Sequence, residues 1–277
     1  MKKYILLNLL VALQLIASAW HSPRNHQQAS AYGSTYAVVI GIADYKYDTS
    51  APDLTWTIND ADKFTAFLRS INGGKVPAEN IYLLKDANAK KANILHYARQ
   101  LFAKAKENDR VIFFFSGHGT PGALVPHDGV HNVKQNISYN LLYFKELQQV
   151  MKDAKCKTKM IFADACHSGS IKGDAKATTS YKENQKADEA SKSIEVAIMT
   201  ASSARELSIE MPDLKMGLFS YHLIKGLGGG ADADKDSSVT MIELHNYVYR
   251  RVKAANPKQS PVTFGKFDKA MVVSVLK

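Results

Sequence analysis

Short apolar runs alternate with amphipathic helical segments along most of this chain of 277 residues. An apolar run of about four to eight residues bounded by turn-forming residues is typical of a strand buried on both faces. Apolar residues spaced three and four apart are typical of a helix that covers such a sheet. The alternation predicts an α/β fold with a largely parallel sheet and right-handed crossovers. We expect strands at 36–42, 81–84, 111–115, 159–163, 196–200 and 270–276, and helices at 59–71, 90–106, 141–151, 217–227 and 241–255.

Two of the expected strands end in short polar motifs. The strand at 111–115 leads into Ser116-Gly-His118-Gly, and the strand at 159–163 leads into Asp164-Ala-Cys166-His-Ser-Gly. Open α/β sheets keep their ligands at the carboxyl ends of their strands, so both motifs should lie at one edge. A cysteine beside a histidine forms a thiolate nucleophile at neutral pH. The glycines around His118 allow a tight turn and expose amides that suit an oxyanion hole.

These motifs resemble those of the caspase-like cysteine peptidases of clan CD, family C14, and in particular the bacterial metacaspase-like members. The resemblance implies the caspase-haemoglobinase fold, a six-stranded, mostly parallel sheet flanked by helices. It also implies that His118 and Cys166 form the catalytic dyad, and that the backbone amides of Gly119 and Cys166 bind the oxyanion. His167 is not the base in this family pattern. The matching segments are 36–45, 59–60, 111–119, 160–169, 197–203 and 217–227.

The resemblance implies a specificity as well. In metacaspases the positions of Asp60, Ser116 and Asp164 line an acidic S1 pocket, which receives the Arg or Lys that precedes the cleaved bond. Carboxylates bind a guanidinium strongly, and an unpaired buried carboxylate is costly. Taken alone, Asp60 could serve only the helix start and Asp164 only a structural hydrogen bond. Cleavage after Asp is the alternative, but it would need arginines, and Arg205 is the only one near the fifth strand.

The first 19 residues differ from the rest of the chain. Lys2 and Lys3 precede an apolar run that ends in Ala17-Ser-Ala19. This order is typical of a secretory signal peptide cleaved after Ala19, with an uncleaved anchor as the alternative. We expect a signal peptide at 1–19, a flexible lead-in at 20–33 and a peptidase domain at 34–277. The mature protein is expected to be periplasmic or secreted and to have no membrane association.

Charge and cysteine content limit the partners. The chain has 36 basic residues, 34 without Lys2 and Lys3, against 26 acidic residues, which leaves a net charge of +8. The lysines are scattered and are not interleaved with aromatic residues, so we expect protein or peptide substrates and no nucleic acid. Cys156 and Cys166 lie at opposite ends of one expected strand, too far apart for a disulfide, and both should be free thiols. Resemblance to single-domain bacterial members implies a monomer.

The segment 170–193 lacks apolar periodicity and is rich in lysine, serine, alanine and acidic residues. This composition predicts a long mobile loop. Caspase-like peptidases are often cut in the corresponding segment, so an enzyme specific for basic residues could process itself here. A solvated insertion that is never cut is the alternative. The candidate cleavage sites are Lys172, Lys176, Lys182, Lys186 and Lys192.

The segment 232–243 has the ligand spacing of an EF-hand calcium loop and lies between two expected helices. Ser237 replaces the glycine expected at the sixth position. The alternative is an acidic loop in which Thr240 and Glu243 form a capping box. The chemistry itself needs no cofactor, and Ca²⁺ is the one candidate ion. A non-catalytic, calcium-binding interaction module with a caspase fold is therefore a second functional hypothesis. The candidate ligands are Asp232, Asp234, Asp236, Ser238, Thr240 and Glu243.

Overall fold

The computed structural model describes residues 33–45, 52–132, 134–165, 196–203, 206, 208–268 and 270–276. The expected signal peptide at 1–19, nearly all of the lead-in, Cys166 and the lysine-rich loop at 170–193 lie outside these residues. Within the described part of the chain, no helix combines the length and the apolarity needed to cross a membrane.

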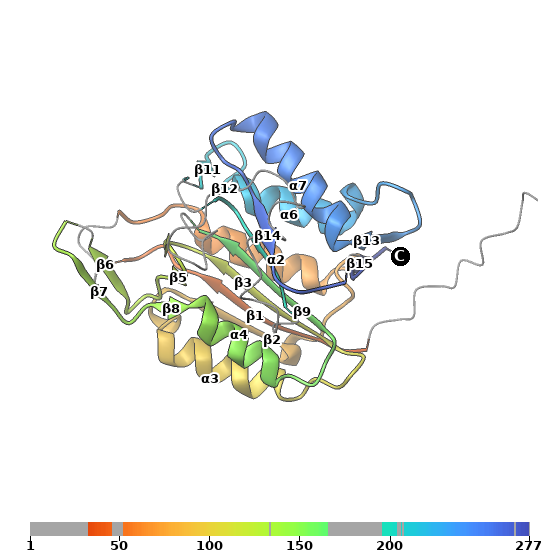
Figure 1. The fold of residues 1–277 in the computed structure, drawn as a ribbon, viewed down its shortest axis with the longest axis horizontal. Coiled ribbons are helices and arrows are strands. Elements are labelled where there is room, and N and C mark those ends of the chain that lie inside the picture. Colours follow the sequence, from red (N-terminus) through yellow and green to blue (C-terminus); the bar gives the residue numbers. More distant parts are fainter. Residues whose placement is uncertain are drawn as a thin grey trace, which may run out of the picture. The chain divides into compact units, whose positions relative to one another are not determined.

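A six-stranded sheet forms the centre of the fold, with the strand order β14-β10-β9-β3-β1-β2 (Figure 1). All neighbouring strands are parallel except β14, which is antiparallel to β10. This confirms the predicted fold class. The strands are β1 (Thr35–Gly41), β2 (Ile81–Lys85), β3 (Arg110–Ser116), β9 (Thr158–Asp164), β10 (Ala197–Thr200) and β14 (Val262–Phe264).

The register of the central strands sets the position of their polar ends. Every residue of β3 is buried, as expected for a strand covered on both faces. Gly41 of β1 pairs with Ser116 of β3, and Ser116 pairs with Asp164 of β9. The three strands therefore end at one level, and the residues that follow them share one edge of the sheet.

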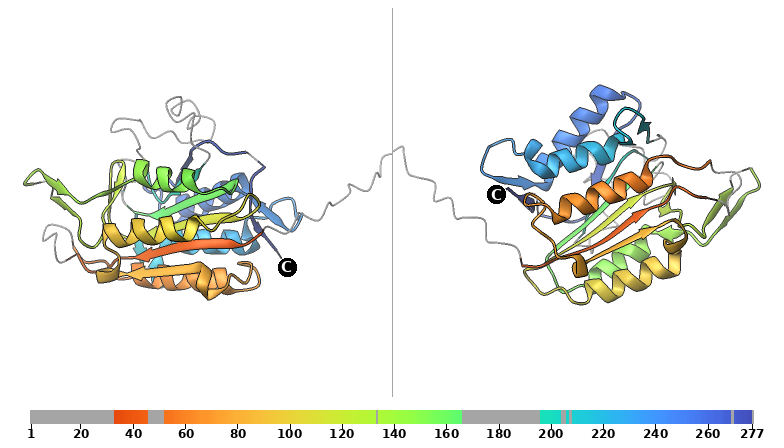
Figure 2. Two further views of the ribbon diagram at one scale, coloured as in Figure 1. Left: turned by 90° about the horizontal axis from the view of Figure 1, so that it is seen from below. Right: turned by 180° about the vertical axis from the view of Figure 1, so that it is seen from behind.

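Helices cover both faces of the sheet (Figures 1 and 2). On one face α3 (Lys91–Phe102) and α4 (Phe144–Asp153) pack with Phe113 and Phe115 of β3 in one apolar cluster. On the other face the helices pack with Phe114 and Phe162 in a second cluster. These helices are α2 (Thr57–Arg69), α6 (Leu218–Lys225) and α7 (Met241–Ala255). Short helical turns are η1 (Ala78–Asn80), η2 (Asp86–Asn88) and the π-helical η3 (Gly226–Gly230).

The assignment of the sixth strand was wrong. The run at 270–276 gives β15 (Val272–Val275), which pairs antiparallel with β13 (Ser238–Thr240) outside the central sheet. The sixth strand of the central sheet is instead β14, whose residues Val262 and Thr263 are buried. Three residues after a proline are too few to show a periodicity, and an edge position tolerates a neighbouring proline.

Several short strands were also missed. Each has only two or three residues and lies in a segment where no apolar run is long enough to indicate a strand. The region after β3 forms a three-stranded sheet and a separate hairpin, and a second hairpin precedes α6. These strands are β4 (Gly119–Thr120), β5 (Ala123–Leu124), β8 (Leu142–Tyr143), β6 (Val130–Asn132), β7 (Ile137–Tyr139), β11 (Glu210–Met211) and β12 (Met216–Gly217).

Candidate active site

The three residues expected to form the S1 pocket lie together at the carboxyl edge of the sheet. Ser116 ends β3 and Asp164 ends β9, and the two are paired in register. Asp60 lies in the first turn of α2, the helix that follows β1. All three line one open pocket, and His118 lines it too. The parallel strand ends and one helix start therefore converge on a single site.

Asp60 is 1% exposed and is held by donors from two neighbouring elements. Ser116 Oγ donates to Asp60 Oδ2 at 2.7 Å, and the amide of Gly217 donates to Asp60 Oδ1 at 3.0 Å. Each carboxylate oxygen thus has one donor, so the side chain is fixed toward the pocket and not toward solvent.

Asp164 is 6% exposed and accepts hydrogen bonds on both oxygens. Ser208 Oγ donates to Oδ1 at 2.5 Å, while Ser220 donates to Oδ2 through its amide at 3.0 Å and its hydroxyl at 2.7 Å. Gly217 lies between the two carboxylates, and a Cβ on it would collide with the carboxylate of Asp164 and press on that of Asp60. A glycine here lets both acids approach the same space.

The pocket holds negative charge at a high electrostatic cost. Burial raises the pKa of Asp60 well above its ordinary value, and the charge of Asp164 raises it further. Burial likewise raises the pKa of Asp164, although hydrogen bonds from Ser208 and Ser220 oppose this. Neither acid pairs with a Lys or Arg of the described chain, and no described residue lining the pocket is basic except His118. A bound cation would relieve this cost.

Replacing Asp60 with asparagine is expected to raise the melting temperature at pH 7.5 by several degrees. The pKa of Asp60 is higher in the folded than in the unfolded protein. Stability therefore falls as pH rises from the unfolded pKa to the folded pKa, and the charged form destabilises above that range. Asparagine keeps the shape and removes the charge. Thermal unfolding should show that Asp60→Asn raises the melting temperature above that of wild type by more at pH 7.5 than at pH 4.

Asp62 provides the matched control on the same helix. Its carboxylate forms an ion pair with Lys85 at 2.5 Å, and its side chain is 45% exposed. Asp62→Asn should change stability little, because exposed ion pairs contribute only about 0–1 kcal/mol. A lower melting temperature for Asp60→Asn than for the wild type at pH 7.5 would contradict this account of the pocket.

The pocket contains a third carboxylate, that of Glu210, which was not among the residues predicted from the sequence. Glu210 accepts hydrogen bonds from the amides of Thr55, at 3.1 and 3.0 Å, and Trp56, at 2.6 Å. These amides directly precede α2, where the helix dipole stabilises a negative charge. Glu210 lines the pocket, and its charge contributes to the raised pKa values of Asp60 and Asp164. No sequence pattern indicates Glu210, because its strand β11 (Glu210–Met211) has only two residues.

The ring of His118 is fixed from two sides. Nε2 lies 2.7 Å from the carbonyl oxygen of Pro52, and because a carbonyl only accepts, Nε2 carries the proton. The buried ring of Tyr45 packs against the imidazole, with centroids 4.4 Å apart. The Tyr45 hydroxyl also accepts a hydrogen bond from the amide of His118 at 2.7 Å. In the neutral ring, Nδ1 is then the nitrogen that can take up a proton.

The turn that carries His118 depends on Gly117. A side chain on Gly117 would collide with the hydroxyl of Tyr45, and the amide of Gly117 donates to the carbonyl of Asp164 at 3.1 Å. Gly119 begins β4 and pairs with Leu124 of β5. Because Cys166 lies outside the described residues, the dyad and the oxyanion contacts of Gly119 and Cys166 stay predictions.

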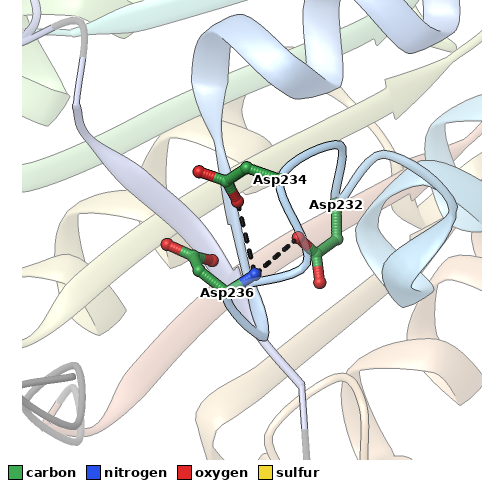
Figure 3. A group of neighbouring side chains, drawn as sticks. All are labelled: Asp232, Asp234 and Asp236. Carbon is green, nitrogen blue, oxygen red and sulfur yellow. Dashed lines mark hydrogen bonds between the residues drawn. The ribbon is translucent and has the colours of Figure 1, made fainter. Parts of the chain in front are cut away.

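The expected calcium loop lies away from this pocket, between η3 and α7. Figure 3 shows Asp232, Asp234 and Asp236 grouped around the turn. One oxygen from each of the three carboxylates lies within 4.8 Å of the others. Ser237 has a φ of 67°, the left-handed conformation that glycine adopts most easily. Carboxylate oxygens are the ligands that Ca²⁺ prefers.

The remaining expected ligands have other partners. Glu243 Oε2 accepts from the amide of Thr240 at 2.9 Å, and Thr240 Oγ1 accepts from the amide of Glu243 at 3.3 Å, which together form the capping box of α7. Glu243 Oε1 accepts from the amide of Ala233 at 3.1 Å, and Ser238 Oγ donates to Asp236 at 2.6 Å. The alternative of a capping loop is therefore realised, and calcium binding stays a prediction.

Cys156 is a buried free thiol, as expected. Burial raises its pKa, so this thiol stays protonated and is a poor nucleophile at neutral pH. The five candidate cleavage lysines and the predicted thiol state of Cys166 fall outside the described residues.

Comparison with known proteins identifies the family. The model of the caspase domain of peptidase family C14 matches residues 34–271. A protein described as a probable protease, from a Desulfuromonadales bacterium, is 24% identical over 78% of this chain and 29% of its own length. Metacaspase-1 of Kluyveromyces lactis is 29% identical over 54% of this chain and 38% of its own length. This chain thus aligns with about a third of each of these curated relatives.

The fold is also similar to that of solved structures. Caspase-1 from Spodoptera frugiperda superposes with a TM-score of 0.62, covering 89% of this chain and 92% of the insect protein. The sequence identity is 13%, so the likeness concerns the fold. It agrees with the six-stranded sheet and its flanking helices.

Proposed function

Since the chain belongs to the caspase-domain family of peptidases, we propose that it is a cysteine endopeptidase that cleaves after Arg or Lys. The observation that carries this specificity is the cluster of carboxylates at the carboxyl edge of the sheet. Asp60 and Asp164 are buried with no described basic partner, and Glu210 lies at the same pocket. A guanidinium or ammonium group would pair with them and offset the desolvation that raises their pKa values.

In this proposal the chemistry follows from the fixed imidazole. The thiolate of Cys166 attacks the carbonyl carbon of the scissile bond and forms an acyl-enzyme. His118 takes up the thiol proton through Nδ1 and gives it to the leaving amine, while Pro52 holds Nε2. Water then attacks the acyl-enzyme and releases the acid. The amides of Gly119 and Cys166 would stabilise the charge that develops on the carbonyl oxygen.

The pocket charge argues against the two alternatives. An enzyme specific for Asp would bring a carboxylate against Asp60, Asp164 and Glu210, which would cost several kcal/mol of repulsion. A non-catalytic interaction module would have no need for a buried acidic pocket beside a fixed imidazole. His118 lines the acidic pocket, which favours a catalytic role for this site.

We further propose that the protein processes itself and is exported. A basic-specific enzyme could cut its own chain after one of the lysines in the loop at 170–193. Removal of residues 1–19 would deliver a monomer to the periplasm or the outside of the cell. Mass spectrometry of the purified protein would give the mature N-terminus, and fragments ending at a loop lysine would report self-processing.

The experiment that tests the proposed function compares fluorogenic peptides that end in Arg, Lys or Asp, with and without calcium. Wild type should release the fluorophore from the Arg and Lys peptides and not from the Asp peptide. Cys166→Ala should cleave none of them and should leave its own loop uncut. Cleavage of the Asp peptide alone would refute the specificity, and no cleavage of any peptide would refute the peptidase activity.

We also propose that the acidic turn at 232–236 binds Ca²⁺, as the ligand spacing predicts. Calcium is expected to raise the melting temperature of wild type by several degrees, because an ion that binds only the folded state stabilises it. The triple variant Asp232→Asn, Asp234→Asn, Asp236→Asn should lose this shift, while Asp213→Asn, an exposed aspartate in another turn, should keep it. An unchanged melting temperature of wild type in millimolar calcium would exclude the site.

A further inference from the structure

Gln259 is a fully buried side chain that lies behind the wall of the acidic pocket. It belongs to the segment between α7 and β14 and is 0% exposed. Its Nε2 donates to the carbonyl of Ala201 at 3.1 Å and to Ser208 Oγ at 3.3 Å, and its Oε1 accepts from the amide of Ile209 at 3.2 Å. Gln259 does not line the pocket, whereas Ser208 and Ile209 do. One buried amide therefore holds two residues of the pocket wall.

The backbone partners of Gln259 dictate the direction of these hydrogen bonds. The carbonyl of Ala201 can only accept and the amide of Ile209 can only donate, so Nε2 and Oε1 cannot exchange places. The second proton of Nε2 then points to Ser208 Oγ. With its oxygen accepting from Gln259, Ser208 directs its own proton to Asp164 Oδ1 at 2.5 Å. The chain of donors runs from Gln259 through Ser208 to Asp164.

The neighbouring residue, Ser260, makes a second set of hydrogen bonds to Glu206, which is close in sequence to Ser208. Ser260 donates to the carboxylate of Glu206 through its amide at 2.7 Å and through its hydroxyl at 2.9 Å. Glu206 also accepts from the amide of Ser203 at 3.3 Å. Residues 259 and 260 thus join the segment that follows β10 to the segment that carries Ser208 and leads into Glu210.

We propose that Gln259 is a positioning residue for recognition of the basic side chain. It acts through Ser208, whose donated proton favours the charged form of Asp164 and fixes its orientation. Without Gln259, Ser208 can turn its proton to another acceptor, and Asp164 loses a donor that opposes its protonation. This inference rests on the proposed function, and it concerns the affinity for the cation and not the reactivity of the thiol.

Gln259→Met tests the inference, because methionine keeps the length of the side chain and removes its polar atoms. The KM for the Arg peptide should rise roughly tenfold, the factor expected when the hydrogen bond from Ser208 to the charged Asp164 is lost. The kcat and the rate at which iodoacetamide alkylates Cys166 should change little, since iodoacetamide carries no basic side chain. Ser208→Ala should raise KM similarly, and the double variant should lose no more than the larger single loss.

Two further variants separate positioning from a general loss of structure. Gln148→Met replaces another buried glutamine, 4% exposed on α4 and away from the pocket, and should leave KM unchanged. Gln259→Glu keeps the shape but offers only acceptors when ionised, so KM should rise at least as much as in Gln259→Met.

The inference is wrong if Gln259→Met leaves KM unchanged. It is also wrong if the increases in KM caused by Gln259→Met and Ser208→Ala multiply in the double variant, or if alkylation of Cys166 slows by as large a factor as KM rises. Preference of wild type for the Asp peptide would refute the basic specificity instead. In that case, comparing the KM of wild type and Gln259→Met for the Asp peptide would still decide whether Gln259 positions the pocket.

Discussion

Cys166→Ala is expected to cleave Arg-terminated peptides about 10⁴-fold more slowly than wild type, or below detection. The reason is chemical, because alanine cannot form the acyl-enzyme and the remaining pocket only binds the substrate. His118→Ala should cause a loss of similar size, since the thiol then has no base fixed by Pro52 and Tyr45. In the proposed mechanism the two residues act as one catalytic unit, so the double variant should be no slower than the slower single variant. Initial rates at saturating peptide measure these losses.

Cys156→Ala is the matched control for the loss of a thiol. Cys156 is 3% exposed, and burial raises its pKa, so it should contribute nothing to the chemistry. This variant should keep its activity and lose about 1 kcal/mol or less of stability through the small cavity it leaves. Loss of activity in folded Cys156→Ala, or normal activity in Cys166→Ala, would overturn the assignment of the nucleophile.

Asp164→Asn is expected to lower kcat/KM for Arg peptides roughly 100-fold, mainly through KM. Removing one charge of a buried pair typically costs 2–5 kcal/mol, much of it because the remaining charge is left unpaired. The asparagine keeps the volume and can still accept from Ser220, so the wall should hold its shape. Steady-state kinetics on Arg and Lys peptides, with iodoacetamide alkylation of Cys166 as a reference, measures the effect.

Asp213→Asn makes the same chemical change on the adjacent hairpin. Asp213 is exposed in the turn between β11 and β12 and does not line the pocket. The kcat/KM of Asp213→Asn for Arg peptides should match that of wild type. If Asp164→Asn also matches wild type on Arg peptides, Asp164 is a structural residue and not a recognition group.

The sequence was sufficient to place the polar ends of the central strands. Long apolar runs identify β1, β3 and β9, and parallel strands bring Ser116 and Asp164 to one edge. Asp60 was identified by resemblance together with its place at a helix start. The sixth strand was misassigned because β14 has only three residues, whereas the longer apolar run at 270–276 forms β15, which pairs with β13 instead. Run length indicates a strand but not its partner.

The supporting residues of the site could not be predicted in the same way. Pro52 acts through its backbone carbonyl, which every residue possesses, so no side chain reveals it. Glu210 lies on a strand of two residues, and its role depends on the distant start of α2. Gln259 lies 51 positions from Ser208, with no local pattern to distinguish it from a surface glutamine. Such contacts depend on the tertiary fold and become visible only with the structure.

We propose that the pocket selects its substrate by positive charge. The most direct measurement compares kcat/KM for four peptides that differ only in the residue before the cleaved bond, namely Arg, Lys, citrulline and Asp. Citrulline matches the size of arginine without its charge. We expect the kcat/KM for the Arg and Lys peptides to be at least about 100-fold higher than for the citrulline and Asp peptides. Equal cleavage of the Arg and citrulline peptides, or preference for Asp, would contradict it.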